Sequence, residues 1–515
     1  MVIQMSEIRA YLLAVVIGTL LRGYDCKNVL FIVIDDLRPD LGCYRGSDFP
    51  ATTDPPIYSP NIDQLASKSI LFKRAHVQQA LCSPSRTSFL TSRRPDTTLV
   101  WDLNAYWRNV SGNFTTIPQY FKNHGHMSVG MGKIFHSPNV SGHDDPISWS
   151  LPYHRENPGK LEGHERSWKF VPDNDTIADP LQDMRIAKDA ITTLGYFAKG
   201  GKYQNQPFFL AVGFIRPHLP FISPISYSKH YPQESVILPR NPLPPVHMPP
   251  VAWTNINELS QYDDMVALQA SGAINSSLPD NTTLGLRKAY YSAVSYLDAM
   301  VGSVLDELKR LNLDNNTIVS LIGDHGYHLG EHGLWCKFTN FELATHAPMI
   351  IRIPGLTDQG IVTESLVEMV DLFPTLVEAS GLPKLPVCPP NSKSVRTCTE
   401  GESLMPLVSN PSMKWKNAAF SQYPRTQSMT NIMGYTIRTD EHRYTEWPEF
   451  SYTTHTPDWT RLHGKELYDH TIDPDENVNR SADPLYANIT RILKARLHAG
   501  WRDSSPSINP SVIVG

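Results

Sequence analysis

The stretch Asn28-Val-Leu-Phe-Ile-Val-Ile34, followed at once by Asp35-Asp36, indicates the fold. Its apolar residues run without alternation, which is typical of a central strand covered on both faces of a parallel sheet. Further strands are predicted at 127–134, 208–212, 317–322 and 348–353. Helices are predicted between them, at 61–72, 184–198 and 294–308. This alternation predicts an α/β fold with a large, mostly parallel central sheet sandwiched by helices.

The pattern changes after the last of these strands. Between Leu382 and Lys416 the chain is dominated by Pro, Ser, Asn and Lys, which predicts a domain boundary. Beyond it, segments 432–438 and 442–447 predict a hairpin, and 485–497 predicts a helix. We therefore expect a main domain over residues 24–410 and a smaller C-terminal α+β domain with an antiparallel sheet over 418–515.

The N-terminus predicts entry into the secretory pathway. Arg9 precedes an apolar run from Tyr11 to Leu21, which is shorter than the ~20 residues needed to span a bilayer and suits a secretory signal over residues 1–23. A short buried strand or helix is the alternative. No other stretch approaches membrane-spanning length, so the mature form is expected to lack a membrane segment. Sequons for N-glycosylation agree with this route, at Asn109, Asn113, Asn139, Asn174, Asn275, Asn281, Asn315, Asn479 and Asn488.

Charge and cysteine content narrow the class of protein. A net charge of −5 over 515 residues argues against a nucleic-acid partner, which would select a basic face. Six cysteines at wide spacing are no disulfide framework. Cys388 and Cys398 flank a short Pro-rich loop and could close a local bridge, whereas Cys26, Cys43 and Cys336 receive no assignment.

Polar residues stand where two predicted central strands end. Asp35-Asp36 follows the first strand, and Asp324-His325-Gly326 follows the strand at 317–322. Adjacent carboxylates repel, and a hard divalent cation would hold both charged; a turn or helix-cap acid pair is the alternative. Ligands collect beyond the carboxyl ends of such strands, so the two groups predict an oxygen-rich metal site. Calcium, magnesium and manganese all fit this donor set, and zinc would prefer more nitrogen or sulfur.

A cysteine stands at the start of another predicted helix, in Leu81-Cys82-Ser83-Pro84-Ser85-Arg86. Pro84 suits the first turn and Ser83 the cap, which places Cys82 where unpaired amides favour a negative group. Arg86, one turn on, can point to the same place. The alternative is a small buried cysteine before an amphipathic helix.

Together these motifs resemble the sulfatase family. Cys82-x-Pro84-Ser85-Arg86 matches its C-x-P-S-R signature, and Gly132-Lys133-Ile-Phe-His136 and Lys337 follow in the family's order. The resemblance runs from about Asn28 to Asn479. It implies an alkaline phosphatase-like fold and conversion of Cys82 to formylglycine by a formylglycine-generating enzyme during biosynthesis.

The resemblance also implies a role for each site residue. One Ca²⁺ is expected on Asp35, Asp36, Asp324, His325 and the modified residue 82. The implied catalytic residues act on the nucleophile or on the sulfate. Arg86 and Lys133 would stabilise the hydrate, His136 would be the base that breaks the covalent intermediate, and His218 and Lys337 would hold sulfate and protonate the leaving oxygen.

Several segments are similar to the iduronate-2-sulfatase branch of the family, among them 93–98, 113–121 and Ser421-Gln-Tyr-Pro-Arg425. This likeness implies hydrolysis of the 2-sulfate of iduronate in heparan sulfate and dermatan sulfate, with the enzyme in the lysosome or, alternatively, secreted. Tyr327 departs from the branch, which has Trp there, and 137–176 looks shortened. Both departures bear on sugar specificity.

Three other functions stay open. A sulfatase of different sugar specificity, or a phosphodiester or phosphonate hydrolase of the same superfamily, would share the metal acids and the formylglycine. A non-catalytic glycan-binding protein on the same scaffold is disfavoured, because every catalytic position of the family pattern is filled.

Overall fold

A seven-stranded sheet forms the centre of the computed structural model, which describes residues 27–46, 55–136, 138–163 and 165–514. The predicted signal and Cys26 lie outside the described residues. All neighbouring strands are parallel except β10, which runs antiparallel to both of its neighbours. Across the sheet the order is β11 (Ile361–Glu368), β2 (Ile70–His76), β10 (Met349–Arg352), β7 (Thr317–Gly323), β1 (Asn28–Ile34), β5 (Phe208–Phe214) and β3 (Met127–Gly132).

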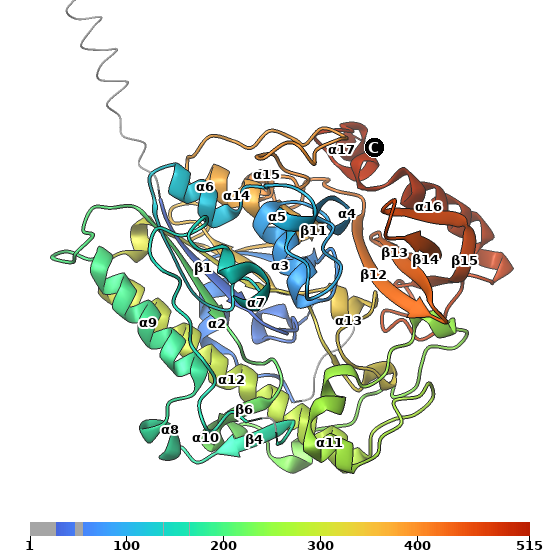
Figure 1. Ribbon diagram of the computed structural model, residues 1–515, viewed down its shortest axis with the longest axis horizontal. Coiled ribbons are helices and arrows are strands. Elements are labelled where there is room, and N and C mark those ends of the chain that lie inside the picture. The colour runs from blue at the N-terminus through green and yellow to red at the C-terminus, as the bar shows by residue number, and fades with distance from the viewer. Residues whose placement is uncertain (1–26, 47–54, 137, 164, 515) are drawn as a thin grey trace, which may run out of the picture.

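Two helical layers bury the two faces of this sheet (Figure 1). Alternate residues of β1 show the division: Leu30 and Ile32 pack with one layer, and Phe31 and Val33 pack with the other. The first layer holds α2 (Pro60–Ala66), α9 (Gln182–Phe197) and α12 (Asp280–Arg310). The second holds α3 (Cys82–Thr91), α6 (Ile117–Asn123) and α14 (Leu372–Ala379). The predicted mostly parallel sheet between helices is confirmed.

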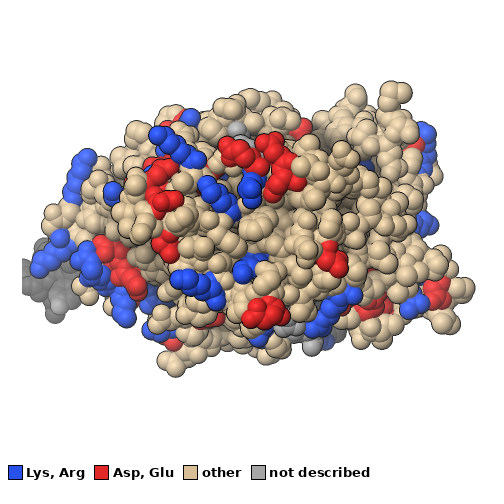
Figure 2. Space-filling view, turned by 90° about the horizontal axis from the view of Figure 1, so that it is seen from below, with Lys and Arg blue, Asp and Glu red and all other residues tan. Residues whose placement is uncertain are grey.

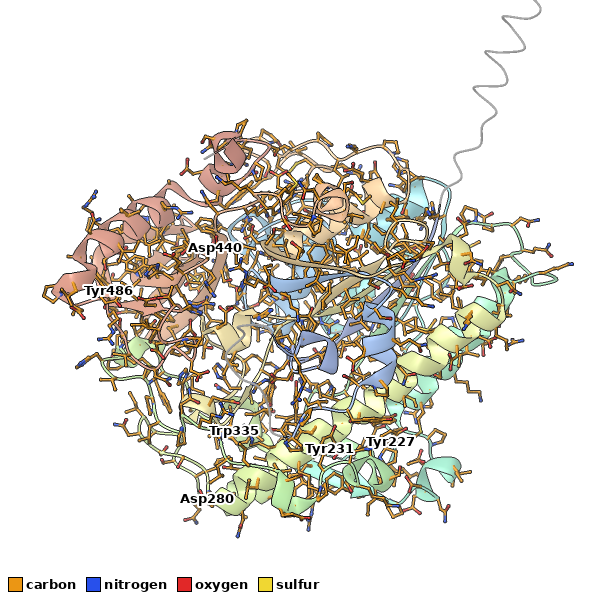
Figure 3. All side chains as sticks on the ribbon, turned by 180° about the vertical axis from the view of Figure 1, so that it is seen from behind. Tyr227, Tyr231, Asp280, Trp335, Asp440 and Tyr486 are labelled. Atoms are coloured by element: carbon orange, nitrogen blue, oxygen red, sulfur yellow. A yellow bond between two sulfur atoms is a disulfide. The ribbon has the colours of Figure 1, made fainter. Side chains whose placement is uncertain are left out.

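The C-terminal part forms a four-stranded antiparallel meander with one helix against it. The predicted hairpin and helix are confirmed. The two hairpin strands pair antiparallel on either side of the turn Thr439-Asp-Glu441. In chain order the elements are β12 (Ala419–Gln427), β13 (Thr430–Arg438), β14 (His442–Ser451), β15 (Thr456–Asp469) and α16 (Ala487–Ala499). Figure 3 shows this part, marked by Asp440 and Tyr486, away from Asp280 at the start of α12.

Short elements complete the chain. Two-stranded ladders pair β4 (Trp168–Val171) with β6 (Phe221–Pro224), and β8 (His328–Leu329) with β9 (Trp335–Cys336). The short helices are α4 (Pro95–Thr98), α5 (Trp107–Val110), α7 (Pro138–Ser141), α8 (Asp175–Ala178), α10 (Ile225–Ser228), α11 (Asp263–Ala267), α13 (Glu342–Thr345), α15 (Met405–Ser409) and α17 (Ser511–Val514).

Two local predictions were wrong. The helix predicted over 61–72 ends at Ala66, and the apolar residues from Ile70 onward enter β2, which the sequence analysis did not identify. Ser83 lies inside the first turn of α3 and Leu81 is the N-cap, although Cys82 does begin the helix. The suggested bridge between Cys388 and Cys398 is present.

Two features of the structure relate to charge and to hydropathy. Lys and Arg side chains are interspersed with Asp and Glu on the face shown in Figure 2, without an extended basic stripe there. Within the described part of the chain, every helix is too short or too polar to cross a bilayer.

Candidate active site

Four neighbouring strands deliver polar residues to one edge of the sheet. In the order β7, β1, β5, β3 they end at Gly323, Ile34, Phe214 and Gly132. Parallel pairing sets Ile34 opposite Gly323, so the chain turns off both strands at the same level. The residues that follow are Asp324 and His325, Asp35 and Asp36, His218, and Lys133 and His136.

Backbone hydrogen bonds hold these strand ends together. Asp324 N–H donates to the Ile34 carbonyl at 3.1 Å, and Asp35 N–H donates to that of Phe214 at 3.3 Å. Asp36 has a φ of +59°, a left-handed conformation that few non-glycine residues adopt. This turn directs Asp36 N–H to Asp324 Oδ1, 3.0 Å away.

Cys82 lies at the centre of this edge. Its Sγ is 3.4 Å from His325 Nε2, 3.6 Å from Asp35 Oδ1 and 3.6 Å from Lys133 Nζ. The residue is 1% exposed. Asp35, Cys82, Asp324 and His325 each offer one ligand atom, and these atoms all lie within 4.8 Å of one another. Four of the five predicted metal ligands therefore form one group.

Asp36 turns toward a neighbouring group. Lys337 Nζ donates to both of its carboxylate oxygens, at 3.0 and 3.1 Å, and to Glu258 Oε2 at 2.8 Å. His218 Nε2 lies 3.7 Å from the same Glu258 oxygen. His325 Nδ1 lies 3.5 Å from Asp36 Oδ1 and so connects the two groups. The structure thus brings Lys337 and His218 together beside the Cys82 group.

Arg86 and Lys133 balance the buried acids. Arg86 donates to Asp324 Oδ2 at 2.9 Å and to Asp35 Oδ1 at 3.0 Å, and Lys133 Nζ also binds Asp35. Burial alone would raise the pKa of Asp35, but the charges of Lys133 and Arg86 hold it well below its usual range. Burial raises the pKa of Asp36 to about 6 despite the nearby Lys337 charge.

The histidines differ in environment. Burial, followed by the charge of Lys133, lowers the pKa of His136 to about 3, and its Nδ1 has no hydrogen-bond partner among the described residues. Burial would also lower the pKa of His325, but Asp324 and Cys82 raise it to about 10. His136 is therefore a neutral imidazole with a lone pair available to accept a proton.

Glu258 is a site residue that the sequence analysis missed. It lies in the 3₁₀ segment Asn257–Gln261, within an irregular region between β6 and α12. Burial would raise its pKa, but Lys337 and His218 lower it to about 2. No motif or periodic pattern surrounds it, so its contact with Lys337 could be found only from the fold.

Comparison with known proteins agrees with this geometry. The Sulfatase family matches residues 27–382, and the C-terminal family of N-sulphoglucosamine sulphohydrolase matches 330–502. Iduronate 2-sulfatase of Mus musculus is 38% identical over 91% of this chain and 93% of its own length. The Homo sapiens protein is 38% identical over 91% and 94%.

Solved structures share the fold at low sequence identity. BT4656 in complex with its substrate D-glucosamine-2-N,6-O-disulfate has a TM-score of 0.68 at 19% identity, covering 93% of this chain and 98% of its own. BT1596, described as a 2-O GAG sulfatase, has a TM-score of 0.65 at 21% identity, covering 93% and 92%.

The resemblance found in the sequence, to the sulfatases and to their iduronate-2-sulfatase branch, is thereby confirmed. Members of this family generally use a formylglycine and a metal ion, and Asp35, Cys82, Asp324 and His325 form a group that could hold one. The chain belongs to the sulfatase family and is a sulfuric ester hydrolase.

Proposed function

We propose that this sulfatase hydrolyses the 2-sulfate of iduronate residues in heparan sulfate and dermatan sulfate, with a formylglycine hydrate at residue 82 as nucleophile. The placement of Cys82 carries the mechanism: its Sγ is buried at the first residue of α3, within 3.6 Å of Asp35, Lys133 and His325. We expect the hydrate oxygens to lie near this sulfur position after modification. The two iduronate 2-sulfatases at 38% identity support the substrate.

The donor set suits a hard cation. Asp35 and Asp324 are fully buried, and burial of carboxylates is costly unless cations neutralise them. We propose one Ca²⁺ on Asp35, Asp36, Asp324, His325 and modified residue 82, because oxygen ligands dominate this set. When bound, calcium would polarise the nucleophile and a sulfate oxygen. A magnesium or manganese ion is the alternative for the same ligands.

The first chemical step displaces the sugar. One hydroxyl of the hydrate loses its proton, and its oxygen forms a bond to sulfur as the bond from sulfur to the sugar oxygen breaks. Asp35 Oδ1, 3.6 Å from Sγ, is positioned to accept that proton. Arg86 and Lys133 would counter the negative charge that develops on the nucleophile. Lys133 Nζ lies 3.6 Å from Cys82 Sγ.

Lys337 and His218 are proposed to act on the leaving group. Lys337 donates to Glu258, and His218 Nε2 lies 3.7 Å from the same oxygen, so an ammonium group and an imidazole flank one carboxylate. A proton from this pair would pass to the departing sugar oxygen, so that the sugar leaves as an alcohol.

The second step releases sulfate. His136 would take the proton of the remaining hydroxyl as the carbon–oxygen double bond re-forms and the bond from carbon to the sulfate oxygen breaks. Water would then add to the aldehyde and restore the hydrate. The neutral state of His136, enforced by burial and by Lys133, supports its role as this base.

The proposed signal also suggests a route through the cell. We propose that residues 1–23 direct the chain into the secretory pathway, that a formylglycine-generating enzyme modifies Cys82 there, and that the enzyme acts in the lysosome or is secreted. A catalytic domain over 24–410 and a C-terminal subdomain over 418–515 remain our proposed division.

The test compares substrates with the purified enzyme. Sulfate release from the 2-position of heparan- and dermatan-derived disaccharides should exceed release from an aryl sulfate or a 6-sulfated glucosamine, and a phosphodiester and a phosphonate ester should be poor substrates. Faster hydrolysis of either phosphorus ester would favour the alternative hydrolase. Absence of turnover on every ester would favour a glycan-binding protein.

A further inference from the structure

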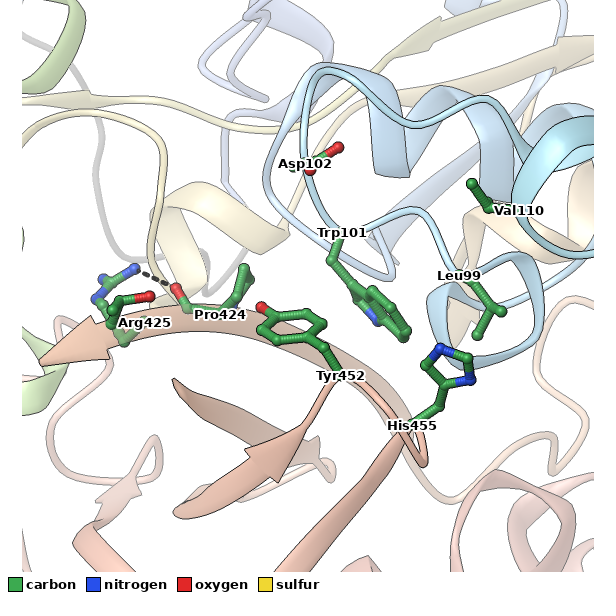
Figure 4. A pocket seen from close by; sticks show the side chains of 9 residues that line it. Leu99, Trp101, Asp102, Val110, Pro424, Arg425, Tyr452 and His455 are labelled. Atoms are coloured by element: carbon green, nitrogen blue, oxygen red, sulfur yellow. Dashed lines mark hydrogen bonds between the residues drawn. The ribbon is translucent and has the colours of Figure 1, made fainter. Parts of the chain in front are cut away.

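The protein has a solvent-open pocket of about 460 Å³, lined by residues outside the proposed catalytic centre. This volume falls within the ~300–1,000 Å³ typical of ligand sites. One wall comes from the segment between α4 and α5, and the other from β12 and the turn between β14 and β15 (Figure 4). The lining residues are Leu99, Trp101, Asp102, Val110, Pro424, Arg425, Thr426, Tyr452 and His455.

We propose that this pocket is a subsite for a further sugar of the sulfated chain, in which Arg425 binds a second anionic group of the substrate. The proposal rests on the proposed function and extends it from the sulfated sugar to its neighbour. The anion is a carboxylate or a sulfate, since either accepts a charge-assisted hydrogen bond from a guanidinium N–H.

Arg425 carries a charge that the protein does not pair. Its guanidinium lies 4.6 Å from the Tyr423 ring centroid and 5.5 Å from that of Trp447. Its N–H groups donate to backbone carbonyls, and its Nε has no hydrogen-bond partner. Among the residues that the structure describes, no carboxylate lies within ion-pair distance of it. A cation in such surroundings gains more from a ligand anion than a solvated one would.

Both walls of the pocket are hydrogen-bonded to segments that carry residues of the catalytic centre. Arg425 Nη2 donates to the carbonyl of Phe338, the residue after Lys337, at 2.6 Å. On the other wall, the carbonyl of Trp101 accepts from Gln79 Nε2 at 2.7 Å, three residues before Cys82. Phe338 N–H in turn donates to the Ala80 carbonyl at 3.2 Å. The two walls of the pocket are therefore hydrogen-bonded to the segments that carry Lys337 and Cys82.

Aromatic side chains give the pocket a surface for a sugar ring. Figure 4 shows Tyr452 and Trp101 between Arg425 at one end and His455 at the other. The Trp101 centroid lies 5.4 Å from that of Tyr452 and 5.7 Å from that of His455, and Tyr452 is 37% exposed. The apolar face of a pyranose can pack on such rings while its hydroxyls reach polar groups. Asp102, which already accepts from the N–H groups of Asn104 and Ala105, is a suitable acceptor for those hydroxyls.

The test measures selectivity for a longer substrate. Wild type, Arg425→Gln, Arg425→Lys and Tyr452→Ala would be compared by kcat/KM on a uronate-2-sulfated tetrasaccharide and on an aryl sulfate. Tyr196→Ala is the matched control, because Tyr196 is 41% exposed on α9, away from the pocket. We expect the tetrasaccharide-to-aryl ratio to fall about tenfold or more in Arg425→Gln and three- to tenfold in Tyr452→Ala, mainly through KM, with partial recovery in Arg425→Lys and no change in the control.

Substrate variants identify the anion. A carboxyl-reduced tetrasaccharide and one that lacks sulfate on the neighbouring sugar would be assayed with wild type and Arg425→Gln. Loss of the Arg425 effect with either variant supports the subsite and names its ligand group. An unchanged selectivity ratio in both Arg425→Gln and Tyr452→Ala, in a wild type that cleaves the tetrasaccharide, refutes the subsite alone. A wild type that cleaves neither sulfate ester refutes the proposed function and the subsite with it.

Discussion

Replacing Glu466 by Gln should change how the stability of the protein depends on pH. Glu466 lies in β15 and is 3% exposed; its oxygens accept from Trp447 Nε1 at 2.7 Å and from Tyr468 Oη at 2.9 Å. Burial raises the pKa of this carboxyl from 4.5 to about 7, against these hydrogen bonds. The folded protein therefore prefers the neutral carboxylic acid.

The sign and size of the effect follow from linkage. Below pH 4.5 the carboxyl is protonated in both the folded and the unfolded chain, so its ionisation does not reduce the free energy of unfolding. As pH rises toward 7, ionisation favours the unfolded chain. Each pKa unit corresponds to ~1.4 kcal/mol, so a rise from 4.5 to about 7 costs about 3 kcal/mol, complete above pH 7. Glutamine has no charge at any pH and avoids this loss.

Thermal unfolding of the two proteins at pH 4.5 and pH 7.5 checks the effect. A chain of this length has an unfolding entropy of roughly 1 kcal/mol per kelvin. The difference in Tm between Glu466→Gln and wild type should therefore move by about 3 °C in favour of the variant at the higher pH.

Glu476→Gln is the contrasting variant. Burial would raise the pKa of Glu476, but Arg443 and His470 lower it to about 2, so its contribution is lost only below about pH 4.5. Its Tm difference should stay flat between pH 5 and 7.5. A Glu466→Gln difference that is equal at both pH values would refute the reasoning.

Three further predictions concern the catalytic centre. Cys82→Ala should abolish sulfate release while Tm stays within a few degrees, and mass spectrometry should find an aldehyde at residue 82 of the wild type; full activity of the variant would exclude the proposed nucleophile. Chelation of divalent cations should lower both activity and Tm, because Asp35 and Asp324 are buried, and calcium should restore both; a fully active metal-free enzyme would contradict the site. Glu258→Gln should lower kcat/KM about tenfold or more, because Lys337 loses a charged hydrogen bond of 2.8 Å, whereas exposed Glu234→Gln should have no effect.

The strand ends explain why so much of the site could be predicted from sequence. Asp35 and Asp324 directly follow fully buried, β-branched strands, and neighbouring parallel strands must end at the same edge of a sheet. Lys133 follows β3 at the same edge and reaches Cys82, but the predicted strand at 127–134 included it, and only the family resemblance identified it. Local patterns therefore predicted the positions of Asp35 and Asp324, whereas that of Lys133 required the resemblance.

Elements without a distinctive period were missed. Strand β2 follows α2 after three residues, and its apolar residues continue the pattern of the helix, so the two were read as one element. The antiparallel direction of β10 leaves no mark in its sequence, because a strand buried on both faces has the same composition in either direction. Glu258 and the unpaired state of Arg425 depend on contacts between distant segments, which no local pattern records.

A buried ion-pair network joins the C-terminal sheet to the segment that carries Lys337. Arg438 and Arg443 of this sheet bind Glu342 of α13, and Arg443 also binds Glu476 at 2.6 Å, in a buried network. Helix α13 begins five residues after Lys337, so the network fixes the segment that carries Lys337 against the sheet. Breaking a buried ion pair typically costs ~3–5 kcal/mol, because the remaining charge is left unpaired. We expect displacement of this sheet to disturb Lys337 and to separate the two walls of the Arg425 pocket at once, which would couple the proposed recognition of a longer substrate to the geometry of the proposed sulfate site.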